Sequence, residues 1–173
     1  MFPRRTESVR EFDAETLHMK SESTSTSMIK VAIVGCGNCA KSLVEGVSLY
    51  SGAKETPGLT FRSVGGYECK DIKFVAAWDV DARKVGKPLA EALVAPPNCA
   101  MTITGKFGPC CEGVVVRKGQ VLDGVGPLML EHPEKGETFC VDPSQPEDSR
   151  EEICRVLRET GADVLLNYLP VGS

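Results

Sequence analysis

The fold is decided by the stretch Ile29-Lys-Val-Ala-Ile-Val-Gly35-Cys-Gly37-Asn-Cys-Ala40. Its apolar, β-branched run predicts a strand, its two glycines predict a tight turn, and the segment 41–50 that follows predicts a helix. Gly35 allows the turn, Gly37 lets a ligand approach the backbone because it has no Cβ, and Ala40 lets the helix pack closely on the strand. This order of elements predicts a site for the pyrophosphate of a dinucleotide. The alternative is a tight strand-to-helix turn that binds no ligand.

The length and charge of the chain fit one globular domain. Its 173 residues suffice for a hydrophobic core, and the net charge of −4 is small. Scattered Lys and Arg argue against a nucleic-acid partner, and no apolar stretch is long enough to span a membrane. Residues 1–27 are mostly polar and lack the apolar centre of a signal peptide, so we expect a disordered tail. A transit peptide is the alternative, disfavoured by acidic residues, and Met19 and Met28 are alternative start sites.

The chain has eight cysteines, which need an explanation. Without a secretory signal we expect reduced thiols and a cytoplasmic protein. Cys36 and Cys39 have the spacing of a zinc or redox pair, but there is no second such pair, and His18 and His132 are the only histidines. We therefore expect no metal site and interpret Cys36 and Cys39 as small side chains that pack in a crowded turn.

After the first helix, strands and helices continue to alternate. Segment 51–70 is rich in Gly and Ser and indicates an ordered insertion. Residues 71–79 are almost continuously apolar, which is typical of a buried parallel strand. Apolar spacing predicts a helix over 82–93, which Pro96-Pro97 would end.

The C-terminal half completes an α/β pattern. Two apolar runs within 113–126 predict a hairpin or an excursion beyond the basic fold. A helix is predicted over 149–160, with a Ser cap and a Gly stop, and a further buried strand over 162–168. The fold class is therefore α/β, a Rossmann-like parallel sheet with flanking helices over 28–173. Because no helix follows to cover the last strand, we expect an incomplete domain, the N-terminal fragment of a longer protein.

An acidic residue ends the second predicted strand, where dinucleotide sites hold the adenine ribose. Asp79 is this residue, and Asp81 follows it. A carboxylate here accepts hydrogen bonds from ribose hydroxyls and repels a 2′-phosphate, which favours NAD over NADP. Arg83 and Lys84 keep NADP open as an alternative. Asp79 can also be a solvated strand end, and Asp81 a helix N-cap.

Longer motifs resemble those of one enzyme family. They are Gly35-Cys-Gly-Asn-Cys-Ala-Lys-Ser-Leu-Val-Glu-Gly46, Gly65-Gly-Tyr67, Asp71-Ile72, Phe74-Val-Ala-Ala-Trp-Asp-Val-Asp81, Lys84-Val-Gly-Lys87, Val121-Leu-Asp-Gly-Val-Gly126, Glu159-Thr160 and Asn167-Tyr-Leu-Pro-Val-Gly-Ser173. From Met28 onward, and in this order, the chain is similar to inositol-1-phosphate (myo-inositol-3-phosphate) synthases of the shorter prokaryotic type. Cys36 stands where that family favours a small aliphatic residue, and the segment 88–112 matches it poorly.

The resemblance implies an NAD-dependent isomerase that converts glucose 6-phosphate into inositol 1-phosphate, in inositol and phospholipid biosynthesis. In that family NAD oxidises C5 of the sugar, an aldol step closes the ring, and bound NADH reduces the ketone. The family's catalytic lysines and tetramer-forming sheet lie beyond the Pro-Val-Gly-Ser motif, so we expect no catalytic residue in this chain and a homo-oligomer only with the C-terminal part. The expected cofactor-binding residues are Gly35, Cys36, Gly37, Asn38, Cys39, Ala40, Asp79, Leu169, Pro170, Val171, Gly172 and Ser173.

Two other functions fit the same residues. One is another NAD-dependent Rossmann oxidoreductase that consumes NAD stoichiometrically, which a net change of NADH absorbance during turnover would favour. The other is a non-catalytic nucleotide-binding module. A folded, monodisperse chain that binds NAD and works as it stands would favour the module.

Overall fold

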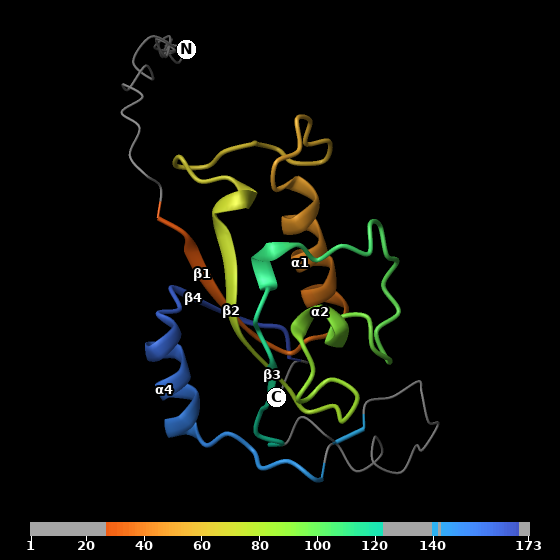
Figure 1. Cartoon of the computed structure of the whole chain (residues 1–173), viewed down its shortest axis with the longest axis vertical. Coiled ribbons are helices and arrows are strands. Elements are labelled where there is room, and N and C mark those ends of the chain that lie inside the picture. Colours follow the sequence, from red (N-terminus) through yellow and green to blue (C-terminus); the bar gives the residue numbers. More distant parts are fainter. Residues whose placement is uncertain (1–26, 123–139, 142, 170–173) are drawn as a thin grey trace, which may run out of the picture.

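The computed structural model describes residues 27–122, 140–141 and 143–169, and these form a parallel sheet flanked by helices (Figure 1). The expected tail lies outside the described residues except for Ser27. The strands are β1 (Ile29–Val34), β2 (Ile72–Asp79), β3 (Val116–Lys118) and β4 (Val164–Asn167). Their order in the sheet is β3-β2-β1-β4, and all three pairings are parallel. This arrangement confirms the predicted Rossmann-like α/β class.

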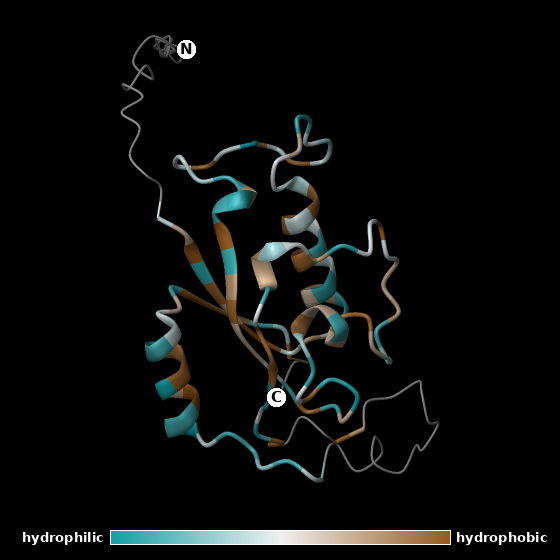
Figure 2. Cartoon of the chain, viewed as in Figure 1, coloured by the Kyte–Doolittle hydropathy of each residue, from teal (hydrophilic) through white to brown (hydrophobic). Residues whose placement is uncertain are grey.

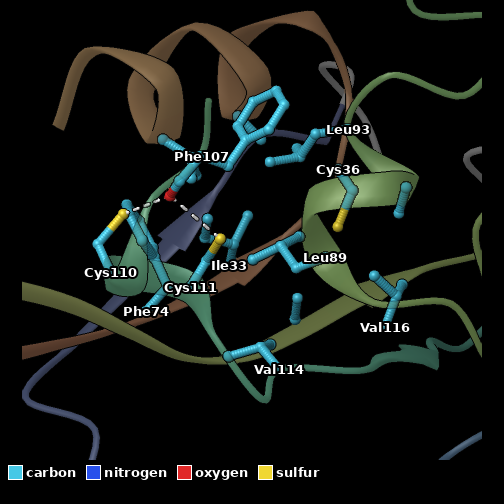
Figure 3. Packing of buried hydrophobic residues seen from close by; sticks show 14 of the residues in the cluster. Ile33, Cys36, Phe74, Leu89, Leu93, Phe107, Cys110, Cys111, Val114 and Val116 are labelled. Carbon is cyan, nitrogen blue, oxygen red and sulfur yellow. Dashed lines mark hydrogen bonds between the residues drawn. The ribbon is translucent and has the colours of Figure 1, made fainter. Parts of the chain in front are cut away.

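Helices cover both faces of the sheet. The helical elements are α1 (Asn38–Tyr50), η2 (Cys69–Asp71), α2 (Leu89–Ala92), η3 (Pro109–Cys111) and α4 (Arg150–Thr160). Val31 and Ile33 of β1 pack with α1, α2 and η3 in the larger core (Figure 3), whereas Ala32 packs with α4 on the other face. Neighbouring side chains of a strand point to opposite faces, so both faces of β1 contribute to the hydrophobic core. Figure 2 shows that hydrophobic residues make up much of the central strands. None of the described helices is both long and apolar enough to cross a membrane.

The elements with strong local signals lie where the sequence predicts them. β1 and β2 coincide with the apolar runs, and α1 contains the predicted helix 41–50 but begins earlier, at Asn38, directly after Gly37. α4 begins after Ser149, whose hydroxyl accepts the Glu152 N–H at 3.2 Å, and ends at Gly161 with φ +64°. A capping hydroxyl and a left-handed glycine satisfy backbone groups that a helix leaves unpaired at its ends.

The helix predicted over 82–93 is wrong in its first half. Residues 82–86 form turns, and α2 comprises only Leu89–Ala92. Pro88 explains the shorter helix, because proline lacks the N–H for an intrahelical bond and disfavours helical backbone in the residue before it. The Asp81 carboxylate also accepts the Arg83 N–H at 2.8 Å, which favours a turn at this point.

The hairpin or excursion predicted within 113–126 is wrong over the described residues. Val116–Lys118 forms β3, which pairs parallel with β2 so that Lys118 lies opposite Asp79. The Gly119 N–H then donates to the Asp79 carbonyl at 3.0 Å, at the carboxyl end of the strand. Gly119 therefore marks the end of a strand of the parallel sheet rather than a reversal, while residues 123–126 lie outside the described part.

The last strand is more exposed than the sequence predicts. We expected a buried strand over 162–168, but Val164 and Leu165 of β4 are 41% and 47% exposed. β4 is an edge strand of the described sheet, and only Leu166 packs against the larger core. Apolar sequence alone cannot distinguish a central strand from an edge strand.

Candidate functional site

The glycine turn joins β1 to α1 at the carboxyl edge of the sheet. Gly35 has a φ of +91°, and a Cβ at this position would lie 3.1 Å from the Tyr168 carbonyl carbon. Only glycine fits both constraints readily. The Gly35 N–H donates to the Trp78 carbonyl at 2.9 Å, and Ala40 is completely buried against the sheet. The steric roles expected for Gly35 and Ala40 are therefore confirmed.

The N-terminus of α1 is open. Gly37 is the N-cap, and a Cβ there would meet no atom within 4 Å. No side chain caps the helix, and its first turn contains no acidic residue. The N–H groups of residues 37–40 donate to none of the described residues. Unpaired N–H groups and the positive end of the helix dipole together favour an anion at this point.

A cavity of about 420 Å³ lies beside this helix end. Its wall includes the residues that directly follow the four strands, Gly35, Val80, Gly119 and Tyr168. The strand order reverses here, because the chain runs outward from β1 to β3 and returns to form β4 on the other side. Open α/β sheets bind their ligands at such a point.

Some of the expected cofactor-binding residues line the cavity. Those in its wall are Gly35, Gly37, Asn38, Asp79 and Leu169. Those not in its wall are Cys36, Cys39 and Ala40. Those outside the described residues are Pro170, Val171, Gly172 and Ser173.

The carboxylate of Asp79 is turned toward the glycine turn. Its Oδ2 accepts the Cys36 N–H at 2.8 Å and lies 3.6 Å from Lys84 Nζ. Its Oδ1 accepts the N–H groups of Val80 and Asp81 at 2.8 and 2.9 Å. The side chain lines the cavity but is only 10% exposed. Asp79 therefore holds the turn, and a ribose hydroxyl would have to share a carboxylate that already has these partners.

Asp81 is completely buried and caps a turn rather than a helix. Its carboxylate accepts the Arg83 guanidinium at 2.6 and 2.8 Å and the Cys140 N–H at 3.1 Å. Burial acts to raise the pKa of Asp81, but the hydrogen bonds from Arg83 and Cys140 outweigh it and hold the pKa below its usual range. The alternative that Asp81 is a helix N-cap is therefore wrong, because a turn and not a helix follows it, and Asp81 engages Arg83.

Lys84 and Asn98 complete the wall next to the turn. Lys84 is 4% exposed, and its Nζ donates to the Cys36 carbonyl at 3.0 Å and to Asn98 Oδ1 at 2.9 Å. Asn98 Nδ2 donates to the same Cys36 carbonyl at 2.9 Å. The sequence indicates Lys84 only as a cation near Asp79, and it contains no signal for Asn98, which lies 62 residues from Cys36.

The loop after α2 is held against α1 by polar side chains on one face of the helix. Asn38 Oδ1 accepts the N–H groups of Cys99 and Ala100 at 2.8 and 2.7 Å. The buried Lys41 donates to the Ala100 carbonyl and, at 2.7 Å, to Thr102 Oγ1. The side chain of Asn38 is thus committed to the loop, which leaves its backbone N–H for a ligand.

Glu45 continues this polar face one turn further along α1. Its Oε1 accepts the N–H groups of Ile103, Thr104 and Gly105 at 2.6 to 2.9 Å, and the residue is 2% exposed. Burial acts to raise the pKa of Glu45, but these hydrogen bonds outweigh it, so the pKa lies below its usual range. The fold therefore favours the charged form of Glu45.

Glu45→Gln is expected to flatten the acid side of the stability profile. The folded-state pKa of Glu45 lies below the unfolded value of about 4.3, so its charge stabilises the fold above that pH. This stabilisation is lost as the pH falls through the folded-state pKa. The free energy of unfolding in urea should therefore fall less steeply with acid in Glu45→Gln than in the unaltered chain. The exposed Glu55→Gln serves as control, and equal slopes in both variants would contradict the role of Glu45.

The two cysteines expected to pack in the turn differ from each other, and Cys39 lies in the first turn of α1. Cys36 is completely buried, and its burial together with the charge of Asp79 raises the pKa of its thiol. Cys39 is exposed. The packing interpretation is therefore correct for Cys36 and wrong for Cys39. All eight cysteines are free thiols, and the described residues contain no cluster of three or more potential metal ligands.

A second cysteine pair belongs to the core. Cys110 and Cys111 of η3 both donate to the Phe107 carbonyl, at 3.0 and 3.4 Å (Figure 3). They pack with Phe74 and Leu89 in the larger core. The segment 88–112, which resembles the family poorly, thus contributes to the hydrophobic core of this chain.

Comparison with known proteins finds inositol-3-phosphate synthases among the relatives of this chain. The chain is 44% identical over 148 residues to an inositol-3-phosphate synthase of Mycolicibacterium smegmatis, which is 84% of this chain and 37% of that protein. An inositol-3-phosphate synthase of Mycobacterium tuberculosis is 42% identical over the same shares. One from Corynebacterium glutamicum is 43% identical over 152 residues, 86% of this chain and 38% of that protein. No family model matches the chain.

Solved structures share the fold. The crystal structure of Ari2 is 31% identical, with a TM-score of 0.61 over 83% of this chain and 38% of that chain. A myo-inositol-1-phosphate synthase-related protein from Thermotoga maritima is 22% identical, with a TM-score of 0.55 over 82% and 34%, and supports the fold alone. The chain spans little more than a third of the length of the curated relatives it matches. Over 84% of its length the chain is similar in sequence to inositol-3-phosphate synthases.

Proposed function

We propose that the cavity binds NAD and that the chain is the cofactor-binding part of an inositol-3-phosphate synthase. The observation that carries this proposal is the uncapped N-terminus of α1 at Gly37, which opens into a cavity at the switch point of the sheet. A Cβ at Gly37 would project into open space, so its absence leaves room for a pyrophosphate against the backbone. The described residues therefore fit a dinucleotide.

The charges around Asp79 favour NAD over NADP. Asp79 places a carboxylate in the cavity wall, and a carboxylate disfavours a 2′-phosphate. Arg83 is engaged by Asp81, and Lys84 by Asp79 and the Cys36 carbonyl, so both nearby cations already have partners. The alternative that they receive a 2′-phosphate would require these contacts to break.

The proposed substrate of the whole protein is glucose 6-phosphate, which the family isomerises to inositol phosphate for inositol and phospholipid biosynthesis. When bound, NAD supplies a reversible hydride acceptor. In this proposal the described residues bind and orient the dinucleotide, and the chain contributes no catalytic side chain. We further propose residues 28–173 as the cofactor-binding domain, a cytoplasmic location, and a homo-oligomer, a tetramer in the family, that requires the C-terminal part.

The chain is expected to bind NAD without turning over sugar phosphate. Trp78 is the single tryptophan and lines the cavity, so its fluorescence should change when NAD is titrated. The chain covers 37% of a synthase of this family, so glucose 6-phosphate and NAD should give no inositol phosphate. Absence of NAD binding by fluorescence and calorimetry would refute the proposed cofactor. Net formation of NADH with a substrate would favour another oxidoreductase.

A further inference from the structure

The peptide groups on both sides of Cys36 are fixed by the buried Lys84 and by the half-buried Asp79 and Asn98. The Cys36 N–H donates to Asp79, and the Cys36 carbonyl accepts from both Lys84 and Asn98. Lys84 also donates to Asn98 and forms an ion pair with Asp79 at 3.6 Å, so the three side chains form one connected network around the turn.

Fixing the Cys36 carbonyl also fixes the next N–H group. In a trans peptide the carbonyl and the following N–H point to opposite sides of the chain. The carbonyl of Cys36 is drawn to Lys84 and Asn98, so the N–H of Gly37 points away from them. That N–H donates to none of the described residues and begins the open end of α1.

From this network we infer that Lys84 is a positioning residue of the dinucleotide site, acting together with Asn98. Lys84 holds the Cys36 carbonyl and the Asp79 carboxylate in one arrangement, and thereby keeps the N–H groups of the turn directed at the pyrophosphate. The inference rests on the proposed function. It assigns Lys84 a role through the backbone rather than as a direct partner of the ligand.

The burial of Lys84 supports this role. The ammonium is 4% exposed and has three polar partners in the turn and its wall. A buried ammonium needs such partners to remain charged. Lys87, in the same turn, is exposed and thus offers a matched control.

The test compares Lys84→Met, Asn98→Ala and the control Lys87→Met. Calorimetry and Trp78 fluorescence would give the affinities for NAD, ADP and adenosine, and thermal unfolding would verify that each variant is folded. Lys84→Met and Asn98→Ala should each weaken NAD and ADP by at least about tenfold, the loss typical of a strong hydrogen bond. Adenosine lacks the pyrophosphate, so its affinity should change less than about twofold. Lys87→Met should bind all three ligands like the unaltered chain.

Each result separates the inference from its alternatives. Unchanged NAD affinity in folded Lys84→Met would overturn the inference while leaving NAD binding intact. An effect of Lys84→Met without one of Asn98→Ala would overturn it in favour of a direct contact between the ammonium and the phosphates. An equal loss for adenosine would mean a general disturbance of the cavity and would also overturn it. Failure of the unaltered chain to bind NAD or ADP would instead refute the proposed function on which the inference rests.

Discussion

Gly37→Val is expected to abolish measurable NAD binding while the fold survives. A Cβ at Gly37 meets no protein atom within 4 Å, and the backbone there has a φ of −83°, which valine can adopt. The added methyl groups would occupy the space in front of the open N–H groups of α1. Losing two hydrogen bonds to an anion, at about 1.5–3 kcal/mol each, lowers affinity by roughly two to four orders of magnitude.

The contrast with other glycines makes this result specific. Gly46 lies inside α1 and also has no atom within 4 Å of an added Cβ, so Gly46→Ala is a matched control that should bind NAD normally. Gly35→Ala should instead lower the free energy of unfolding, because its Cβ would lie 3.1 Å from Tyr168 in a left-handed backbone conformation. Calorimetry with NAD and urea unfolding of all three variants would measure both effects. Normal NAD affinity in Gly37→Val would show that the pyrophosphate does not bind at this turn.

Much of the fold follows from local sequence signals. β1, β2 and α4 are bounded by residues whose chemistry acts within a few positions, such as Ser149 and Gly161 at the ends of α4. β3 is only three residues long, and its identity comes from pairing with β2 about 40 residues earlier, which no local pattern encodes. The prediction of a helix over 82–93 failed because Pro88 lies within this segment, and its effect on the backbone outweighs the helical spacing of the apolar residues.

The site likewise has a part that local sequence predicts and a part that depends on contacts between distant residues. The glycine turn could be predicted because strand, turn and helix adjoin in sequence. The loop along α1 could not, since its contacts with Asn38, Lys41 and Glu45 join residues 58 to 62 positions apart. Asp79 was predicted as a ligand of the ribose, but its hydrogen bond to the Cys36 N–H shows a second, structural task. Because of this structural role, removing the Asp79 side chain should lower the stability of the fold as well as the affinity for the dinucleotide.

Asp79→Ala is expected to destabilise the fold by about 3 kcal/mol, the lower end of the range for breaking a buried ion pair. The substitution would leave the ammonium of Lys84, 4% exposed, without its carboxylate, and the Cys36 N–H without its acceptor. Urea unfolding at neutral pH would measure the loss. The exposed Glu55→Ala provides the control and should stay within about 0.5 kcal/mol of the unaltered chain. A loss no larger than the control's would show that Lys84 does not depend on Asp79.

Asp79→Asn separates this structural role from ligand choice. The amide keeps the size of the side chain and one oxygen acceptor, so its effect on stability should be smaller than that of Asp79→Ala. It removes the negative charge from the cavity wall, and NAD should therefore bind more weakly while NADP gains relative to NAD. Titrating both dinucleotides into the folded variant gives the affinity ratio directly. If the ratio of NAD to NADP affinity equals that of the unaltered chain, Asp79 only supports the glycine turn. Other groups of the cavity wall would then bind the ribose.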